Sequence, residues 1–485
     1  MASMNCWRCL ARPSQRLLLA PVSISVSASM TASITAPSLS TSAAFSTTSA
    51  NQVYAKKNAQ TPSKKGDPMS RHIRTGKKMA LSKKKKKYAR VRKPAPGERK
   101  AFRKRIQLSN DNALEVRGLE PIASEIVVDP ESVGKMVGIP GELVDQLRGC
   151  EAFKPSQNWS LFRAPHMLIR SETVELGKRM ADAVEKKETL RMVVTGDRGS
   201  GKSILGLQAL ATGFLNQWVV INVPEGQDLT NAHTEYTQIP HSNKFSQPVY
   251  TVKLMQAIHK TNQEVLSKHR VQLDHLHLPI SVGRNMSLAN MLIATKEPDF
   301  AWPVFQSFWK ELLLPGRPPI VFSLDGLAHI MRMSEYRSPA YELIHSHDLG
   351  IVSMFADALG GKTTFANGAV ILGVTSRGNA PRIPSMDKAL EQAVAAKKGE
   401  PIPPRDGLFR KYDERVFDSL RGVDVMDVQG LSRSEARSLL EYWAASGVLR
   451  QRVDEKTVTE KWTMSGKGVV GEMERVALYD IRSAA

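Results

Sequence analysis

The sequence predicts an α/β protein with a doubly wound parallel sheet, of the P-loop NTPase type found in AAA and signalling ATPases. Three observations support this fold class. Residues 196–203 read GDRGSGKS, a complete GxxxxGKS motif between an apolar run and a helical pattern. A second apolar run, residues 320–324, ends at Asp325. Finally, apolar runs of strand length alternate with helical segments, as in a parallel sheet covered by helices.

Residues 1–50 have the composition of a mitochondrial transit peptide. They are rich in Ser, Thr and Ala, and no acidic residue precedes Asp67. Arg8, Arg12 and Arg16 recur every four residues, so a helix would carry them on one face and leucines on much of the rest. A secretory signal fits less well, because arginines interrupt the apolar run. An ordinary Ser-rich tail is the alternative.

Residues 51–105 form a strongly basic arm. The formal net charge is +21, and this segment holds 21 Lys and Arg against Asp67 and Glu98, so residues 106–485 are close to neutral. Such charge density opposes compaction, and we expect a disordered or extended arm that follows an RNA backbone. A solvated tail or a nuclear localisation signal is the alternative, although the transit peptide argues against the nucleus. The candidate RNA-binding residues are Lys83, Lys84, Lys85, Lys86, Lys87, Arg90, Arg92, Lys93, Arg103, Lys104 and Arg105.

The composition also excludes several protein classes. Three cysteines are too few for a disulfide framework, and the Cys6–Cys9 pair has no second pair to complete a zinc site. No apolar stretch reaches the roughly 18 residues that a membrane-spanning helix needs. We therefore expect a soluble protein with no membrane span.

The GxxxxGKS segment predicts a nucleotide site on residues 196–203. Its glycines allow the backbone to wrap a phosphate with its N–H groups inward, and the start of the following helix adds positive potential. Lys202 would neutralise β- and γ-phosphate oxygens, and the Ser203 hydroxyl would bind Mg²⁺. The predicted nucleotide-binding residues of this loop are Gly196, Asp197, Arg198, Gly199, Ser200, Gly201, Lys202 and Ser203.

Asp325 is the second predicted magnesium anchor, as the aspartate of a Walker B strand. The residue after it is Gly326, where many ATPases place a glutamate that activates water, so the usual general base is missing. Glu225 is the only substitute base that can be nominated.

Polar residues follow another predicted strand. The runs 218–223 and 369–374 complete the sheet, and Thr375, Ser376 and Arg377 follow the second of them. Ligands bind at the carboxyl ends of such strands, so Thr375 or Ser376 could sense the γ-phosphate. Arg377 could approach it and is, with Glu225, a candidate catalytic residue; ordinary polar strand ends are the alternative. No NKxD follows Asp325, so these motifs leave guanine or adenine open.

The remaining segments are assigned by composition and periodicity. Residues 106–189 are expected to be an N-terminal extension that packs on the core, and residues 190–378 the nucleotide-binding domain. Five prolines around a short helical stretch make residues 379–406 an insertion or linker. Residues 407–485 are expected to form a helical lid domain near the nucleotide, with a capping box at Ser432 and Glu435 and a further helix over 472–481.

Several of these segments occur in one known family. The segment LFRAPHMLIR at 161–170, GDRGSGKS at 196–203, SLDG at 323–326, SEYR at 334–337 and the stretch 345–355 stand in the same order there. On these residues the chain resembles the death-associated protein three family, P-loop proteins of the small subunit of the mitochondrial ribosome.

The resemblance implies a place in the head of the small subunit, in the mitochondrial matrix. It implies contacts with ribosomal RNA and neighbouring small-subunit proteins, to which we add an intersubunit contact with the large subunit. It also implies a bound guanine nucleotide, GTP or GDP, although ATP is compatible with the motifs. The missing glutamate at Gly326 fits a nucleotide used for structure more than for turnover.

Three functions are therefore open. A structural ribosomal protein would be stabilised by its nucleotide, with slow or no hydrolysis. A working NTPase or signalling switch of the matrix would complete catalysis with Glu225 and Arg377. An RNA-binding regulator would dock only transiently.

Overall fold

The computed structural model describes residues 106–378, 380–405, 407 and 411–482. The predicted transit peptide, residues 1–50, and the predicted basic arm, residues 51–105, lie outside the described residues, as do all the candidate RNA-binding residues.

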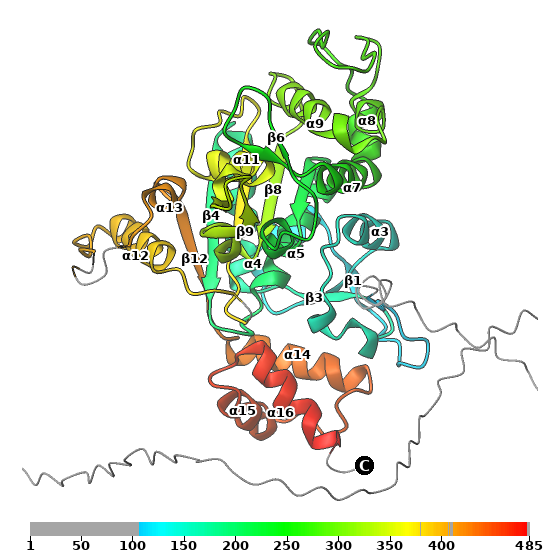
Figure 1. Ribbon diagram of the computed structural model, residues 1–485. Helices are drawn as coiled ribbons and strands as arrows, with labels where there is room; N and C mark the ends of the chain where they lie inside the picture. The colour runs from blue at the N-terminus through cyan, green and yellow to red at the C-terminus, as the bar shows by residue number, and fades with distance from the viewer. Residues whose placement is uncertain (1–105, 379, 406, 408–410, 483–485) are drawn as a thin grey trace, which may run out of the picture. The chain divides into compact units, whose positions relative to one another are not determined.

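A five-stranded parallel sheet forms the centre of the fold (Figure 1). Every strand pair in it is parallel, which confirms the predicted α/β class with a parallel sheet. Its strand order is β12-β4-β11-β8-β5. The strands are β4 (Thr189–Gly196), β5 (Val219–Val223), β8 (Ile320–Asp325), β11 (Ala369–Val374) and β12 (Asp424–Val428).

Helices cover both faces of this sheet. Successive side chains of a strand point to opposite faces, so each buried strand contributes to a core on either side. Met192 and Val194 of β4 pack in one core with α4 (Ser171–Glu185) and α5 (Lys202–Leu215). Val193, between them, packs in a second core on the opposite face. The helices of that second core include α7 (Pro248–Ser267), α9 (Pro298–Leu312) and α11 (Gly350–Leu359).

The register brings the polar strand ends together. Val374 is paired with Val194 on one side and with Asp325 on the other, and Val428 is paired with Gly196. The GxxxxGKS loop at residues 196–203 (called the P-loop below), Asp325 and the residues after β11 therefore lie along one edge of the sheet. This is the edge where ligands bind in parallel sheets, at the carboxyl ends of the strands.

The segment before β4 packs on the sheet. It contains a small sheet, and its buried residues Leu147, Met167 and Ile169 join the same core as Met192 and Val194. Its elements are β1 (Glu120–Pro121), α2 (Ser124–Val128), η2 (Pro130–Ser132), β2 (Met136–Gly138), α3 (Gly141–Gly149), η3 (Pro155–Gln157), η4 (Trp159–Leu161) and β3 (His166–Leu168).

Two long connections carry short elements beside the main helices. The connection between β5 and β8 adds α6 (Gly226–Thr230), β6 (Thr237–Gln238), β7 (Phe245–Ser246) and α8 (Leu288–Leu292). The connection between β8 and β11 adds α10 (Leu327–Ile330), β9 (Met333–Arg337), β10 (Leu343–His345) and η5 (Ser346–Asp348).

The region after β11 differs from the sequence-based expectation in two ways. Residues 379–406 hold α12 (Pro384–Lys398), whose Met386 and Leu390 are buried in the sheet's core, so this segment is more than a linker. Residues 407–485 are not wholly helical. After α13 (Glu414–Ser419), β12 forms the edge of the main sheet beside β4. The sequence DVMDV did not predict this strand. An edge strand can keep charged side chains in solvent, so it lacks the continuous apolar run of a central strand.

The last three helices form a separate small core. They are α14 (Arg433–Ala445), α15 (Glu455–Met464) and α16 (Val470–Arg482), grouped beyond the carboxyl ends of the strands in Figure 1. Leu440, Trp443 and Met473 are buried together there. The predicted capping box is present, because Ser432 Oγ accepts from the Glu435 N–H and Glu435 accepts from the Ser432 N–H.

Candidate nucleotide site

The loop between β4 and α5 has a backbone that favours glycine. The φ angles of Gly196, Gly199 and Gly201 are 143°, 79° and 101°, in the left-handed region that L side chains rarely adopt. A Cβ atom on Gly196 would also lie 2.5 Å from the carbonyl oxygen of Val428. The loop that follows β4 therefore depends on its glycines, as the motif predicts.

Lys202 begins α5 and lies across the loop. Its Nζ donates to the carbonyl oxygens of Gly196, at 3.0 Å, and Asp197, at 2.5 Å. Burial lowers the pKa of Lys202, and Arg377 adds to this effect, while Asp197 and Asp325 oppose it. Backbone carbonyls therefore hold the ammonium at the place where a phosphate would be bound.

Ser203 and Asp325 meet at one oxygen atom. The Ser203 hydroxyl donates to Asp325 Oδ2 at 2.8 Å, and the Gly326 N–H donates to Oδ1 at 2.7 Å. Lys154, from the N-terminal extension, also binds Oδ2 through its Nζ. The sequence motifs did not predict Lys154 as a partner of Asp325.

This pair fits the needs of Mg²⁺. Mg²⁺ is usually held by one or two carboxylates together with phosphate oxygens and water, rather than by an all-protein cage. In the part of the chain that the structure describes, no cluster of three or more His, Cys, Asp or Glu could hold a metal. Ser203 and Asp325 supply the two oxygens that a phosphate-bound Mg²⁺ would use.

A cavity of about 950 Å³ lies over these residues. Its size falls in the range typical of small-molecule sites. It is bordered by the P-loop, the ends of β8 and β11, the N-terminal extension and helices α14 and α16. Most of the predicted residues line it: Arg198, Gly199, Gly201, Lys202, Ser203, Glu225, Asp325, Thr375, Ser376 and Arg377. Gly196, Asp197 and Ser200 belong to the loop but do not line the cavity.

The polar residues after β11 divide into two groups. Thr375 donates its hydroxyl to the carbonyl oxygen of Val194 at 2.9 Å, so this side chain ties two strands together. Ser376 and Arg377 face the cavity, and Arg377 Nη1 lies 3.4 Å from Asp197 Oδ1 of the P-loop.

The predicted substitute base, Glu225, lies in the cavity wall with an exposed side chain. At Gly326 the backbone has a φ of 78°, so this position would strain any side chain, including a catalytic glutamate. His329, on α10, lines the cavity as well and was not predicted.

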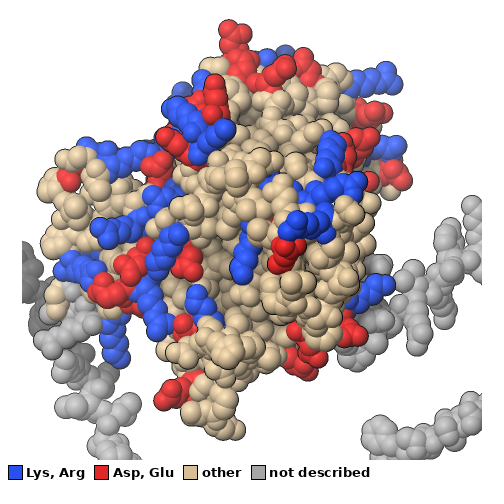
Figure 2. All heavy atoms as spheres, turned by 90° about the horizontal axis from the view of Figure 1, so that it is seen from above, with Lys and Arg blue, Asp and Glu red and all other residues tan. Residues whose placement is uncertain are grey.

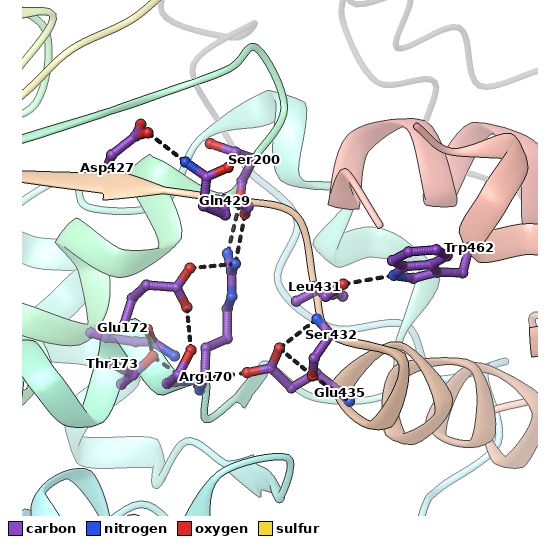
Figure 3. A network of polar contacts seen from close by, with 12 residues as sticks. Arg170, Glu172, Thr173, Ser200, Asp427, Gln429, Leu431, Ser432, Glu435 and Trp462 are labelled. Carbon is purple, nitrogen blue, oxygen red and sulfur yellow. Dashed lines mark hydrogen bonds and ion pairs between the residues drawn. The ribbon is translucent and has the colours of Figure 1, made fainter. Parts of the chain in front are cut away.

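Arg170 is the main structural residue that the sequence did not predict (Figure 3). It is 8% exposed. Its Nη1 donates to the carbonyl oxygen of Ser200 at 2.7 Å, and its Nη2 donates to that of Gln429 at 2.8 Å and to Glu172 at 2.9 Å. One guanidinium therefore connects the P-loop, α4 and the segment that leads from β12 to α14.

Two further contacts hold the C-terminal helices against the site. The Ser171 N–H donates to Glu435 Oε1 at 3.1 Å, so the carboxylate of the α14 capping box also binds the start of α4 (Figure 3). The Gly471 N–H, near the start of α16, donates to the carbonyl oxygen of Gly199 at 2.9 Å. The P-loop is thus in direct contact with α16.

Three aromatic residues of the cavity lining, Trp159, Phe162 and His166, pack together. His166 stacks near Phe162 and Tyr442, with ring centroids 4.4 and 4.0 Å away, and Trp159 lies beyond it at 5.9 Å. Burial lowers the pKa of His166 to about 4, so this ring is neutral at pH 7. Apolar and aromatic side chains with a few polar groups are typical of the walls of small-molecule sites.

Charge is mixed on the face drawn in Figure 2. Figure 2 shows Lys and Arg interspersed with Asp and Glu on one face. In the part of the chain that the structure covers, no helix is both long and apolar enough to cross a membrane.

Comparison with known proteins gives matches along the whole chain. A family model described as mitochondrial ribosomal death-associated protein 3 matches residues 167–476. The chain is 46% identical over 488 residues to the small ribosomal subunit protein mS29 of Neurospora crassa, with 100% of both chains covered. It is 24% identical over 354 residues to the protein of the same name from Schizosaccharomyces pombe, with 71% of each covered.

A solved structure of the Aeropyrum pernix ORC1 protein in complex with DNA is only distantly similar. Its TM-score is 0.30 at 12% identity, and the match covers 68% of this chain and 63% of that one. The family match spans more than half of the sequence and the Neurospora crassa relative matches all of it, so the chain belongs to the mitochondrial ribosomal death-associated protein 3 family.

Proposed function

We propose that this chain is a structural component of the mitochondrial small ribosomal subunit that binds a purine nucleotide, GTP or GDP, with Mg²⁺. Its place is the ribosome of the mitochondrial matrix, where it contacts ribosomal RNA and neighbouring small-subunit proteins. The names of its relatives, small ribosomal subunit protein mS29 in both fungi, support the ribosomal part of this proposal. The nucleotide part depends on the site itself.

The observation that carries the nucleotide proposal is the meeting of three groups at one cavity. The glycine loop, the Lys202 ammonium and the Ser203–Asp325 pair all face the same space of about 950 Å³.

Each residue has a definite role in this proposal. The loop N–H groups and Lys202 bind the phosphates, while Ser203 and Asp325 would hold the Mg²⁺, whose chemistry is to neutralise phosphate charge. Arg170 and Gly471 position the loop from outside. The bound nucleotide then joins the sheet, the N-terminal extension and the C-terminal helices, all of which border the cavity.

Binding of GDP with Mg²⁺ is expected to stabilise the folded chain. At a free ligand concentration 100 times Kd, the free energy of unfolding should rise by about 2.7 kcal/mol. Thermal or chemical denaturation with GDP, GTP and ATP in turn measures this gain and ranks the bases. Asp325→Asn should lose much of this gain, because Asp325 binds both Ser203 and Lys154 at the cavity, whereas Asp357→Asn, on α11 and outside the cavity lining, should keep it. Equal gains in both variants would remove Asp325 from the proposed site.

A working NTPase is the second candidate, favoured by one observation. Arg377 lies 3.4 Å from the P-loop residue Asp197, and Glu225 lines the same cavity. Because Gly326 supplies no base, hydrolysis by the purified chain should be far slower than about 1 per second. Turnover near that rate, abolished in Glu225→Gln, would favour the enzyme instead.

RNA binding is proposed for the basic arm, which lies outside the described residues. Deleting residues 51–105 should lower the affinity for small-subunit RNA and flatten its dependence on salt, by about 0.7–0.9 in the log–log slope for each phosphate that the arm neutralises. Filter binding at several salt concentrations measures the slope, and deletion of residues 1–50 is the control. An unchanged slope would show that the RNA-binding surface lies elsewhere in the chain.

A further inference from the structure

The carboxylate that should anchor magnesium already has a cation. Lys154 Nζ binds Asp325 Oδ2, the same oxygen that accepts the Ser203 hydroxyl at 2.8 Å. The other oxygen, Oδ1, accepts the Gly326 N–H. Both oxygens of Asp325 are therefore bound within the chain, and the positive charge beside them belongs to a side chain 171 residues away in sequence.

Lys154 is anchored more firmly than an ordinary surface lysine. Its N–H donates to Gln157 Oε1 at 2.8 Å, and the same oxygen accepts the Trp159 indole N–H at 2.7 Å. The preceding residue, Phe153, is buried and packs edge-on against Trp159, with ring centroids 5.4 Å apart. The following residue is Pro155, which begins the short helix η3 and fixes the backbone there. The lysine stem therefore starts from a rigid turn.

The position of the ammonium matters because the site has few oxygens for a metal. Asp325 supplies the only carboxylate that touches Ser203 among the described contacts. A Mg²⁺ ion bound there would have to displace Lys154 from Oδ2. An intramolecular partner acts at an effective concentration on the order of millimolar, so displacement is opposed even at abundant Mg²⁺.

We propose that Lys154 is a tethered cation that competes with Mg²⁺ for Asp325 and makes nucleotide binding largely independent of divalent metal. This inference rests on the proposed nucleotide site. Lys154 and Lys202 both line the cavity, so the chain itself provides positive charge on two sides of it. A nucleotide held in this way stays bound when the metal is removed, as suits a structural ligand more than a substrate.

The first test measures nucleotide affinity with and without metal. The full mature chain is titrated with a fluorescent GDP analogue in Mg²⁺ and in EDTA. For the wild type, EDTA should change Kd by less than about threefold. For Lys154→Met, which keeps the stem but removes the charge, EDTA should weaken binding by about tenfold or more, because Mg²⁺ then supplies the positive charge that Lys154 supplies in the wild type. Lys154→Arg should behave like the wild type.

The second test uses metal alone and does not depend on nucleotide. Nucleotide-free protein is titrated with Mn²⁺ and bound ion is followed by electron paramagnetic resonance. Lys154→Met should bind Mn²⁺ about tenfold more tightly than the wild type, because Asp325 is released from its tethered competitor. Lys253→Met is the matched control, since Lys253 forms an exposed ion pair with Glu151, which is close to Lys154 in the sequence.

The two tests separate the possible failures. A wild type that loses GDP in EDTA as strongly as Lys154→Met, or Mn²⁺ affinities that are equal in the two proteins, would overturn the role of Lys154. If the GDP analogue binds none of the proteins, the proposed nucleotide site is wrong, while the Mn²⁺ titration still decides whether Lys154 competes for Asp325.

Discussion

Replacing Arg170 with Met should destabilise the chain by about 3 kcal/mol and reduce nucleotide binding at the same time. Arg170 is buried and binds Ser200, Glu172 and Gln429 together. Methionine keeps much of the apolar stem, but it leaves the Glu172 carboxylate and two carbonyl oxygens without their donor. Removing one partner of a buried ion pair costs about 3–5 kcal/mol, and the partial exposure of Glu172 puts this case at the lower end.

Urea denaturation without nucleotide measures the change, and GDP titration of the folded variant measures the loss of binding. Arg437→Met is the control, because Arg437 forms only exposed ion pairs among the described residues, with Glu441 and Glu455, and should leave the unfolding midpoint close to that of the wild type. The proposed link between α4, the P-loop and the β12–α14 segment fails if Arg170→Met is as stable as this control.

Replacing Arg317 with Met should destabilise the chain by about 3–5 kcal/mol, the cost of leaving a buried charge without its partner. Glu311 is 0% exposed, and Arg317 Nη2 lies 2.5 Å from its Oε2. The other oxygen accepts the Leu273 N–H at 2.6 Å and lies 3.1 Å from His275 Nε2. These contacts fix the loop after α7 to the end of α9, far along the chain from the P-loop.

Two companion variants separate the charge effect from packing. Arg284→Met removes an exposed ion pair with Asp274 in the same loop and should leave the midpoint close to that of the wild type. The double variant Glu311→Leu with Arg317→Met removes both charges and should recover part of the stability that Arg317→Met loses. Chemical denaturation compares the three proteins. A double variant less stable than Arg317→Met would mean that the hydrogen bonds of Glu311 to the Leu273 N–H and His275, rather than the unpaired charge, dominate.

The central strands could be predicted because they are buried on both faces. The runs at β4, β5, β8 and β11 are continuous apolar segments bounded by polar residues, which is the pattern of parallel strands inside a sheet. The edge strand β12 carries Asp424 and Asp427 and pairs on one side only, so its five residues resemble a polar loop. Its membership of the sheet depends on pairing with β4, which lies far earlier in the chain.

Residues of the candidate site could be predicted where they follow a fixed local spacing, and they were missed where their position depends on distant contacts. The P-loop motif located Lys202 and Ser203, and an apolar run located Asp325. Lys154 and Arg170 stand in segments whose charged residues look like ordinary surface residues. Lys154 contacts Asp325, which is 171 residues away in the sequence, and Arg170 contacts Gln429, which is 259 residues away. Thr375 was predicted as a nucleotide-binding residue and lines the cavity, but its hydroxyl donates to the carbonyl oxygen of Val194 on the neighbouring strand β4.

The most direct test of the nucleotide site is mass spectrometry of the small molecules released from purified protein, for the wild type and for Lys202→Ala. The wild type should release GTP or GDP in near-stoichiometric amount. Lys202→Ala should release almost none, because loss of a charged hydrogen bond to phosphate costs about 1.5–3 kcal/mol. Full occupancy in Lys202→Ala, or a wild type that carries no nucleotide, would contradict the proposal.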